Sequence, residues 1–141
     1  MNLQIISFSH SNSALFQQAL LIRETVFVME QGVDKSLEYS GDSDAMHYLV
    51  FDNETPVCTA RWRKTDKGIK LERFAVLAEY RSKGAGKIVL EKIINDIKPL
   101  NQYVYLHAQE GAVSFYLKNG FQIVGEMFLE AGIKHFKMFL K

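Results

Sequence analysis

Hydrophobic positions along the chain follow two different periods, and the change between them predicts the order of helices and strands. Apolar residues recur every three or four positions over residues 15–27 and again over 84–98, as on helices with one buried face. Between these segments the period falls to two, which predicts consecutive strands at residues 46–51, 57–63 and 69–77. Because only short turns separate these strands, we expect an antiparallel meander.

The remaining segments complete a chain of mixed α/β character. They are expected strands at residues 3–8, 103–108, 121–128 and 134–140 and a short helix at 111–117. Runs of antiparallel strands interrupted by crossover helices favour the α/β (α+β mixed) class with one mixed sheet. The length of 141 residues suits a single domain over residues 1–141.

A glycine-rich turn joins the third strand of the meander to the second long helix. Its sequence is Arg81-Ser82-Lys83-Gly84-Ala85-Gly86-Lys87. The first turn of a helix has unpaired N–H groups that attract an anion, and glycine lets phosphate oxygens approach the backbone. Ile88 stands where a P-loop needs Ser or Thr, and Val89 where a dinucleotide motif needs glycine. Taken alone, the turn is either a pyrophosphate site or a plain turn with solvated lysines.

Two motifs, in the right order, resemble those of the GNAT superfamily of N-acetyltransferases. The first is Arg or Gln, two residues, Gly, one residue, and Gly or Ala, and Arg81, Gly84 and Gly86 match it after an apolar strand. The second is matched by Ala112, Phe115, Tyr116, Gly120 and Phe121. Gln109 departs from it, since many members have Asn there. Residues 26–33, 106–109 and 128–135 are similar to a small bacterial branch called ElaA-like.

The resemblance implies a GNAT-type twisted mixed sheet with flanking helices, whose strands 4 and 5 splay apart around acetyl-CoA. Backbone groups of Phe74, Ala75 and Val76 would pair with the pantetheine arm, and an N–H near Val76 would polarise the thioester carbonyl. Amides from Lys83 to Lys87 would bind the pyrophosphate. The resemblance extends the expected cofactor contacts to Arg81, Ser82, Gly84, Ala85, Gly86, Gln109, Ala112 and Phe115.

Three residues are candidates for proton transfer during acetylation. The resemblance assigns Tyr116 as the general acid for the departing CoA thiolate, whereas periodicity alone suggests a packing residue. The base that deprotonates the acceptor amine is either Glu72 on the fourth strand or His107 at the end of the fifth. Glu72 is alternatively a strand carboxylate paired with Arg61 or Arg63, and His107 is alternatively hydrogen-bonded within the sheet.

The acceptor pocket is expected between the first helix, the polar loop 34–44 and the last hairpin. Candidate substrate contacts are Glu30, His47, Arg61 and His135, although both histidines alternatively hold a loop in place. Glu30, Glu38, Asp42 and Asp44 give this side an acidic character, which either suits a cationic amine or marks a solvated loop. A phosphorylated amino sugar, with its phosphate on Arg61 and Arg63, is the competing substrate class. The sequence does not exclude the amines of peptides, at N-termini or lysines, as acceptors.

Composition narrows the remaining function classes. Lys and Arg number 17 against 16 Asp and Glu, too even a balance for broad binding to nucleic acid or an anionic membrane. The only cysteine, Cys58, excludes an internal disulfide and is expected to be a buried hydrophobe rather than an acetyl-cysteine nucleophile. The four histidines are dispersed, so we expect no metal site. No signal peptide or long apolar run is visible, which favours a cytoplasmic protein.

The combined expectation is an acetyl-CoA-dependent N-acetyltransferase. It would transfer the acetyl group to a primary amine of a small molecule or peptide by direct attack in a ternary complex. A non-catalytic acyl-CoA sensor or regulatory module is the alternative, because it would share the same phosphate loop. Because members of the superfamily often form dimers, the resemblance also raises a homodimer as an expectation.

Overall fold

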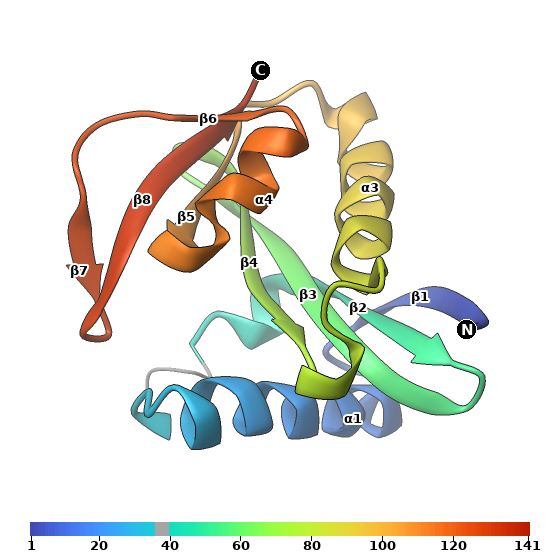
Figure 1. Cartoon of the computed structure of the whole chain (residues 1–141). Helices are drawn as coiled ribbons and strands as arrows, with labels where there is room; N and C mark the ends of the chain where they lie inside the picture. Colours follow the sequence, from blue (N-terminus) through green and yellow to red (C-terminus); the bar gives the residue numbers. More distant parts are fainter. Residues whose placement is uncertain (36–39) are drawn as a thin grey trace.

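The computed structural model describes residues 1–35 and 40–141, and in them one mixed sheet is built from eight strands (Figure 1). The strands are β1 (Leu3–Ser9), β2 (Ala45–Asp52), β3 (Thr55–Thr65), β4 (Gly68–Val76), β5 (Val104–Gln109), β6 (Phe121–Ile123), β7 (Phe128–Glu130) and β8 (Ile133–Leu140). Their order in the sheet is β1-β2-β3-β4-β5-β8-β6, and β7 also pairs with β8. The expected mixed α/β class and the antiparallel meander β2-β3-β4 are confirmed.

Three α-helices in the described part of the chain connect these strands. They are α1 (Ser13–Arg23), α3 (Ala85–Ile97) and α4 (Val113–Lys118). The side chain of Asn12 caps α1 by accepting a hydrogen bond from the Leu15 N–H at 3.2 Å. The helical stripe expected over residues 15–27 continues beyond α1 as a π-helical segment, Glu24–Glu30. None of the described helices is long and apolar enough to cross a membrane.

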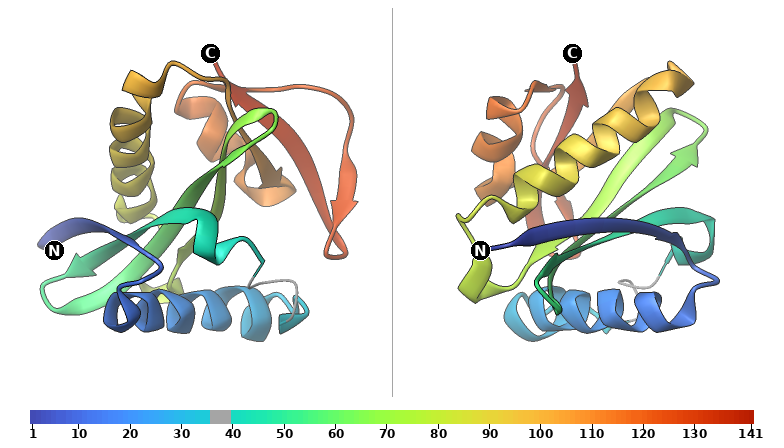
Figure 2. Two further views of the ribbon diagram at one scale, coloured as in Figure 1. Left: turned by 180° about the vertical axis from the view of Figure 1, so that it is seen from behind. Right: turned by 90° about the vertical axis from the view of Figure 1, so that its right-hand side faces the viewer.

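The helices cover both faces of the sheet (Figure 2). One hydrophobic core therefore lies on each face. Val89, Leu90 and Ile93 of α3 pack with alternate residues of β2 to β5 on one face. Phe16, Ala19 and Ile22 of α1 pack on the other face, against residues such as Leu49 of β2. Because side chains alternate along a strand, one residue in two contributes to each core.

The only parallel pairing in the described sheet is between β4 and β5, and it is short. Its partners are Ile69 with Val104, Lys70 with Tyr105 and Leu71 with Leu106. After Leu71 the strands have no further pairs and diverge (Figure 1). The expected splay of the fourth and fifth strands is therefore confirmed.

A β-bulge explains where β4 turns away from its neighbour. Across β3, Thr59 pairs with Ala75 and Arg61 with Glu72, so two residues of β4 stand opposite one of β3. One of the two is Arg73, whose φ of 57° lies in the left-handed region. Such an insertion bends the bulged strand and increases its twist.

One expected strand is wrong in detail. The strand expected at residues 121–128 ends after β6 at Ile123, and β7 begins only at Phe128, because the chain between them leaves the edge of β8. Gly125, with a φ of 84°, lies in this excursion. The alternation of apolar and polar residues along the sequence does not reveal this break between β6 and β7.

Candidate active site

A cleft of about 920 Å³ opens where β4 and β5 separate. Most residues expected to contact the cofactor line it, namely Phe74, Ala75, Val76, Arg81, Ser82, Gly84, Ala85, Gly86, Lys87, Gln109, Ala112 and Phe115. Tyr116, Glu72, His107 and His135 line it as well. Lys83 is not among the lining residues, and its ammonium lies 5.9 Å from the centre of the Tyr80 ring.

The start of α3 provides one end of the cleft with backbone donors. Gly84 precedes the helix with a φ of 93°, and no side chain caps the first turn. The N–H groups of Ala85, Gly86 and Lys87 therefore have no partner within the helix. A Cβ added to Gly84 would meet no heavy atom within 4 Å, so the space above this turn is open. These features fit a phosphate-bearing ligand.

Arg81 is held by the protein rather than left free for a ligand. Its Nε donates to the carbonyl oxygen of Val76 at 2.9 Å, and its Nη2 donates to both carboxylate oxygens of Glu30 at 2.7 and 2.9 Å. Glu30, expected as a substrate contact, is not among the residues that line the cleft and instead fixes Arg81 beside the phosphate turn.

The backbone N–H of Val76 faces the opening between the strands. Cys58 and Val76 are paired across β3 and β4. The hydrogen bond beside this pair joins their neighbours, because the N–H of Leu77 donates to the carbonyl oxygen of Val57. In an antiparallel ladder this pattern marks a pair whose own N–H and C=O groups point away from each other's strand. The Val76 N–H is consequently directed into the cleft, where a thioester carbonyl could accept it.

Tyr116 lies deep in the wall formed by α4. Its ring makes edge contacts with Phe74, Phe115 and Phe121 at centroid distances of 5.9, 5.1 and 5.7 Å. Burial raises the pKa of the Tyr116 hydroxyl above its ordinary value. The phenol therefore keeps its proton at neutral pH, as a general acid requires.

Cys58 does not line the cleft and is completely buried. Burial raises the pKa of its thiol to about 12, so the nucleophilic thiolate is not formed near neutral pH. The geometry favours Cys58 as a packing residue over an acetyl-cysteine nucleophile.

Glu72 is locked by cations on the β4 wall of the cleft. Its Oε1 accepts from Arg63 Nε at 2.6 Å and Arg61 Nη2 at 3.1 Å, and its Oε2 lies 3.3 Å from Lys70 Nζ. Burial raises the pKa of this carboxyl, but the Arg63 hydrogen bond and the nearby charges outweigh it and hold the pKa at about 2. A carboxylate this acidic is a poor acceptor for an ammonium proton, so the geometry does not favour Glu72 as the base.

Arg61 and His47 support a loop behind the site and do not line the cleft. Arg61 is buried, and its Nη1 donates to Asp42 Oδ1 at 2.6 Å. His47 is buried too, with its Nε2 2.9 Å from the carbonyl oxygen of Asp42. Both side chains are thus engaged by protein groups and lie away from the cleft, which favours the alternative that His47 holds a loop in place. Arg23 also binds Asp42, at 2.7 Å, and Glu38 lies outside the described residues.

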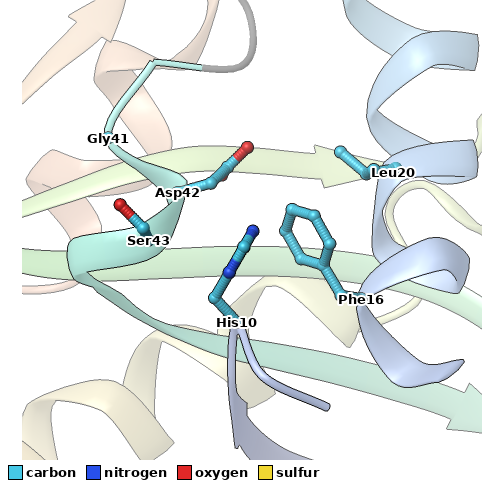
Figure 3. A pocket seen from close by; sticks show the side chains of 6 residues that line it. All are labelled: His10, Phe16, Leu20, Gly41, Asp42 and Ser43. Atoms are coloured by element: carbon cyan, nitrogen blue, oxygen red, sulfur yellow. The ribbon is translucent and has the colours of Figure 1, made fainter. Parts of the chain in front are cut away.

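A second hollow of about 360 Å³ lies on the α1 side of the sheet (Figure 3). Its lining residues are His10, Phe16, Leu20, Gly41, Asp42 and Ser43. The one carboxylate among them, Asp42, is bound to Arg23 and Arg61. The carboxylate that the described residues bring to this hollow is therefore already neutralised by two arginines.

The β7–β8 hairpin brings a second carboxylate to the cleft. Glu130 Oε1 lies 3.0 Å from His107 Nδ1, and Oε2 lies 3.7 Å from His135 Nε2. The His107 hydrogen bond is the main cause that lowers the pKa of the Glu130 carboxyl. His107 and His135 are thus brought together by a residue that lies between the expected strands 121–128 and 134–140 and that the sequence did not single out. Phe128 and Glu130 are two residues apart on a strand, so their side chains lie on the same face, and this spacing was the signal in the sequence that could have placed Glu130 beside the histidines.

The cleft is also bridged by two glutamines. Gln109 Nε2 donates to Gln31 Oε1 at 2.9 Å, and Gln31 Nε2 donates to Gln109 Oε1 at 3.2 Å. Gln31 follows the π-helical segment and Gln109 ends β5, so the bridge links the two sides of the cleft. The sequence singled out Gln109 but not its partner.

A comparison of the sequence with known protein families gives a match over most of the chain. Residues 12–141 match the family described as acetyltransferase (GNAT) domain. The chain belongs to the GNAT acetyltransferases. The resemblance inferred from the two motifs is therefore confirmed, and the family and its curated relatives support an N-acetyltransferase.

Known relatives agree with this family in sequence and in fold. The uncharacterized N-acetyltransferase YjcF of Bacillus subtilis is 40% identical over 132 residues, which cover 90% of this chain and 93% of YjcF. Escherichia coli ElaA has a TM-score of 0.87 with 26% identity, covering 98% of this chain and 99% of ElaA. The PaiA N-acetyltransferase of Thermoplasma acidophilum, solved with coenzyme A, has a TM-score of 0.73 with 20% identity, covering 100% of this chain and 99% of PaiA.

Proposed function

We propose that this acetyltransferase moves the acetyl group of acetyl-CoA to a primary amine of a small molecule or peptide. The transfer would be a direct attack within a ternary complex, carried out by residues 1–141 as one domain in the cytoplasm. The observation that carries the proposal is the cleft between β4 and β5, which combines an open helix N-terminus with titratable side chains. A cleft of this kind can hold both substrates in line, which accounts for much of an enzymatic rate.

The cofactor end of the cleft suits an acyl-CoA. The first N–H groups of α3, beside the open space at Gly84, would hold the pyrophosphate. Edge groups of β4 near Phe74 and Val76 would bind the pantetheine arm, because β5 has left them unpaired. Acetyl-CoA supplies an acetyl group activated as a thioester, and the Val76 N–H would stabilise the charge that develops on its carbonyl oxygen.

Proton transfer divides between the two sides of the cleft. An alkyl ammonium has a pKa of roughly 10, so the acceptor must lose a proton before it can attack. His107 would accept that proton, because its Nε2 has no hydrogen-bond partner among the described residues while Glu72 is held as a carboxylate by three cations. Tyr116 would donate a proton to the departing thiolate.

Calorimetric titration with acetyl-CoA tests the cofactor end. We expect one saturable site per chain in the wild type and a loss of affinity of more than about tenfold in Gly84→Val, because the added side chain fills the space assigned to phosphate. Gly125→Val is the matched control. Gly125 has a similar φ of 84° with nothing within 4 Å of its Cβ, and it does not line the cleft. Equal affinity losses in both variants would mean that backbone strain, and not the phosphate site, is responsible.

Steady-state acetylation of a panel of amines tests the reaction itself. Tyr116→Phe should lower kcat by about 100-fold or more while leaving the acetyl-CoA affinity unchanged, since it removes only the donated proton. An equal loss of turnover and affinity would contradict the acid assignment. Failure of every amine to react, with acetyl-CoA bound, would contradict the proposed acceptor class.

A further inference from the structure

Glu130 is held at a fixed point beside His107 by a tight hairpin. It is the last residue of β7 and pairs with Ile133 of β8 across a two-residue turn. Both turn residues have positive φ, 51° at Ala131 and 76° at Gly132, which matches the twist of a compact hairpin. The carboxylate is therefore carried by a short and well-defined piece of backbone.

The same hairpin and its neighbour strand direct the side chains to one face. His107 alternates with Leu106 and Ala108, which face the core under α3, so His107 points to the opposite side. Phe128 lies 5.0 Å from the His107 ring and 5.8 Å from the His135 ring, between centroids. The two imidazoles and the carboxylate thus surround one aromatic ring at the edge of the cleft.

The hydrogen bond to Glu130 determines which nitrogen of His107 carries the proton. An ionised carboxylate can only accept, so Nδ1 at 3.0 Å must be the donor. In the neutral ring the lone pair then lies on Nε2. Because the side chain of His107 keeps 24% of its exposure and lines the cleft, Nε2 is within reach of a ligand.

We propose that Glu130 is a positioning residue for acetyl transfer, which fixes the Nδ1–H tautomer of His107 so that Nε2 receives the proton of the acceptor ammonium. This role rests on the proposed function. One N–H bond of the ammonium breaks and the proton forms a bond to Nε2, which leaves a neutral amine and an imidazolium. The imidazolium keeps its Nδ1–H on the Glu130 carboxylate, whose negative charge stabilises it.

Several other charged or titratable groups lie on the strands around His107 and Glu130. They are Tyr105 on β5, His135 and Lys137 on β8, and Lys70 and Glu72 on β4. Lys137 pairs directly with His107, and its ammonium lies 5.2 Å from the Tyr105 ring centre. Lys70 acts on Glu130 by its charge. Among the described residues, Glu130 differs from all of them because it is the one whose side chain is hydrogen-bonded to His107.

The pH dependence of kcat/KM, measured with a reactive amine, tests the charge of Glu130. Glu130→Gln removes a negative charge that favours the imidazolium, so the acidic limb of the profile should move to lower pH by about one unit, and the plateau should fall at least about tenfold. Glu130→Asp should recover part of the rate. Glu126→Gln, an exposed carboxylate in the same β6–β7–β8 region, is the matched control and should leave the profile unchanged.

A double-mutant comparison tests whether Glu130 acts through His107. We expect His107→Gln to abolish the acidic limb, and the double variant His107→Gln with Glu130→Gln to be no slower than His107→Gln alone. Multiplying rate losses would overturn the positioning role. Acetyl-CoA affinity, measured by calorimetry for each variant, should stay within about twofold of wild type and shows that the fold is kept.

Imidazole NMR tests the same idea without turnover. Long-range ¹⁵N–¹H spectra above pH 8 should show His107 with the hydrogen on Nδ1 in the wild type and a mixture of tautomers in Glu130→Ala. If no amine is acetylated but the tautomer shifts in this way, the proposed function fails and the positioning by Glu130 stands. If amines are acetylated and the tautomer is unchanged in Glu130→Ala, the positioning role is refuted.

Discussion

The two walls of the cleft each carry one carboxylate, and the protein treats the two groups in opposite ways. On the β4 wall, the side chain of Glu72 is 5% exposed and lies against two guanidinium groups and an ammonium. On the β7–β8 wall, the side chain of Glu130 is 43% exposed and lies against two imidazoles. Both carboxyl pKa values are lowered, but by partners of a different kind.

The difference lies in whether the partner can exchange a proton. Arginine stays protonated at any pH a protein survives, so Glu72 is part of a permanent ion-pair network that runs through Arg61 to Asp42 and Arg23. The partners of Glu130 are imidazoles, and histidine is the side chain type that can both accept and release a proton in an enzyme site. The neighbours of each carboxylate, and not its position on a strand, therefore distinguish the structural role of Glu72 from the positioning role proposed for Glu130.

The largest effect that tests this comparison is expected for Arg61→Met. Arg61 is buried between Asp42 and Glu72, with contacts of 2.6 and 3.1 Å, so its removal leaves two buried carboxylates short of a partner. The free energy of unfolding should fall by about 3 kcal/mol or more in urea denaturation. Lys92→Gln, which breaks the exposed pair with Asp96 at 3.1 Å, should cost less than about 1 kcal/mol. Equal losses would mean that the network on the β4 wall contributes no more than a surface ion pair.

Sequence reasoning was most successful at the cofactor end because that end is built from local backbone. A strand, a glycine-containing turn and a helix are contiguous, so the pattern around Gly84 contains nearly all of the geometry. Even there, the ion pair between Arg81 and Glu30 was not visible, because Glu30 lies far away in the sequence.

The acceptor end was predicted less well because it is assembled from distant segments. His107 and Glu130 come from strands separated by a helix, and their contact depends on the register of β5, β7 and β8. That register in turn depends on the break between β6 and β7, which the apolar pattern did not reveal. Arg61 and His47 were expected in the site, but alternation along β2 and β3 directs both toward the buried Asp42.

A second test of the comparison is the acid stability of Glu72→Gln. The folded-state pKa of Glu72, about 2, lies below its ordinary value of 4.5. The carboxylate therefore stabilises the fold fully above pH 4.5, and this contribution is lost as the pH falls toward 2. It amounts to about 3 kcal/mol, and unfolding measured between these pH values should be less pH-dependent in Glu72→Gln than in the wild type.

Glu130→Gln provides the opposite case in the same experiment. Because Glu130 is about half exposed, its loss should change acid stability much less than the loss of Glu72. In kinetics the order should reverse, since Glu72→Gln should keep the acidic limb of the pH–rate profile that Glu130→Gln displaces. A limb that disappears in Glu72→Gln would identify Glu72 as the base and remove the distinction between the two walls.

The smallest effect is expected for Lys70→Gln, which acts on both walls at once. Lys70 Nζ lies 3.3 Å from Glu72 Oε2, and its charge also lowers the pKa of the Glu130 carboxyl. Glu72 keeps both arginines in this variant, so the free energy of unfolding should fall by less than about 1 kcal/mol. Losing a positive charge near the imidazole favours its protonation, so the acidic limb should move to higher pH by a few tenths of a unit.

The sign of that shift is the informative quantity, because Glu130→Gln is expected to move the same limb to lower pH. Opposite signs follow if both residues act on His107 through their charges. A shift in the same direction would mean that both substitutions disturb the position of the hairpin, and the two walls would then be mechanically rather than electrostatically linked. Lys64→Gln, an exposed lysine on β3, provides the control, since it should leave both stability and the limb unchanged.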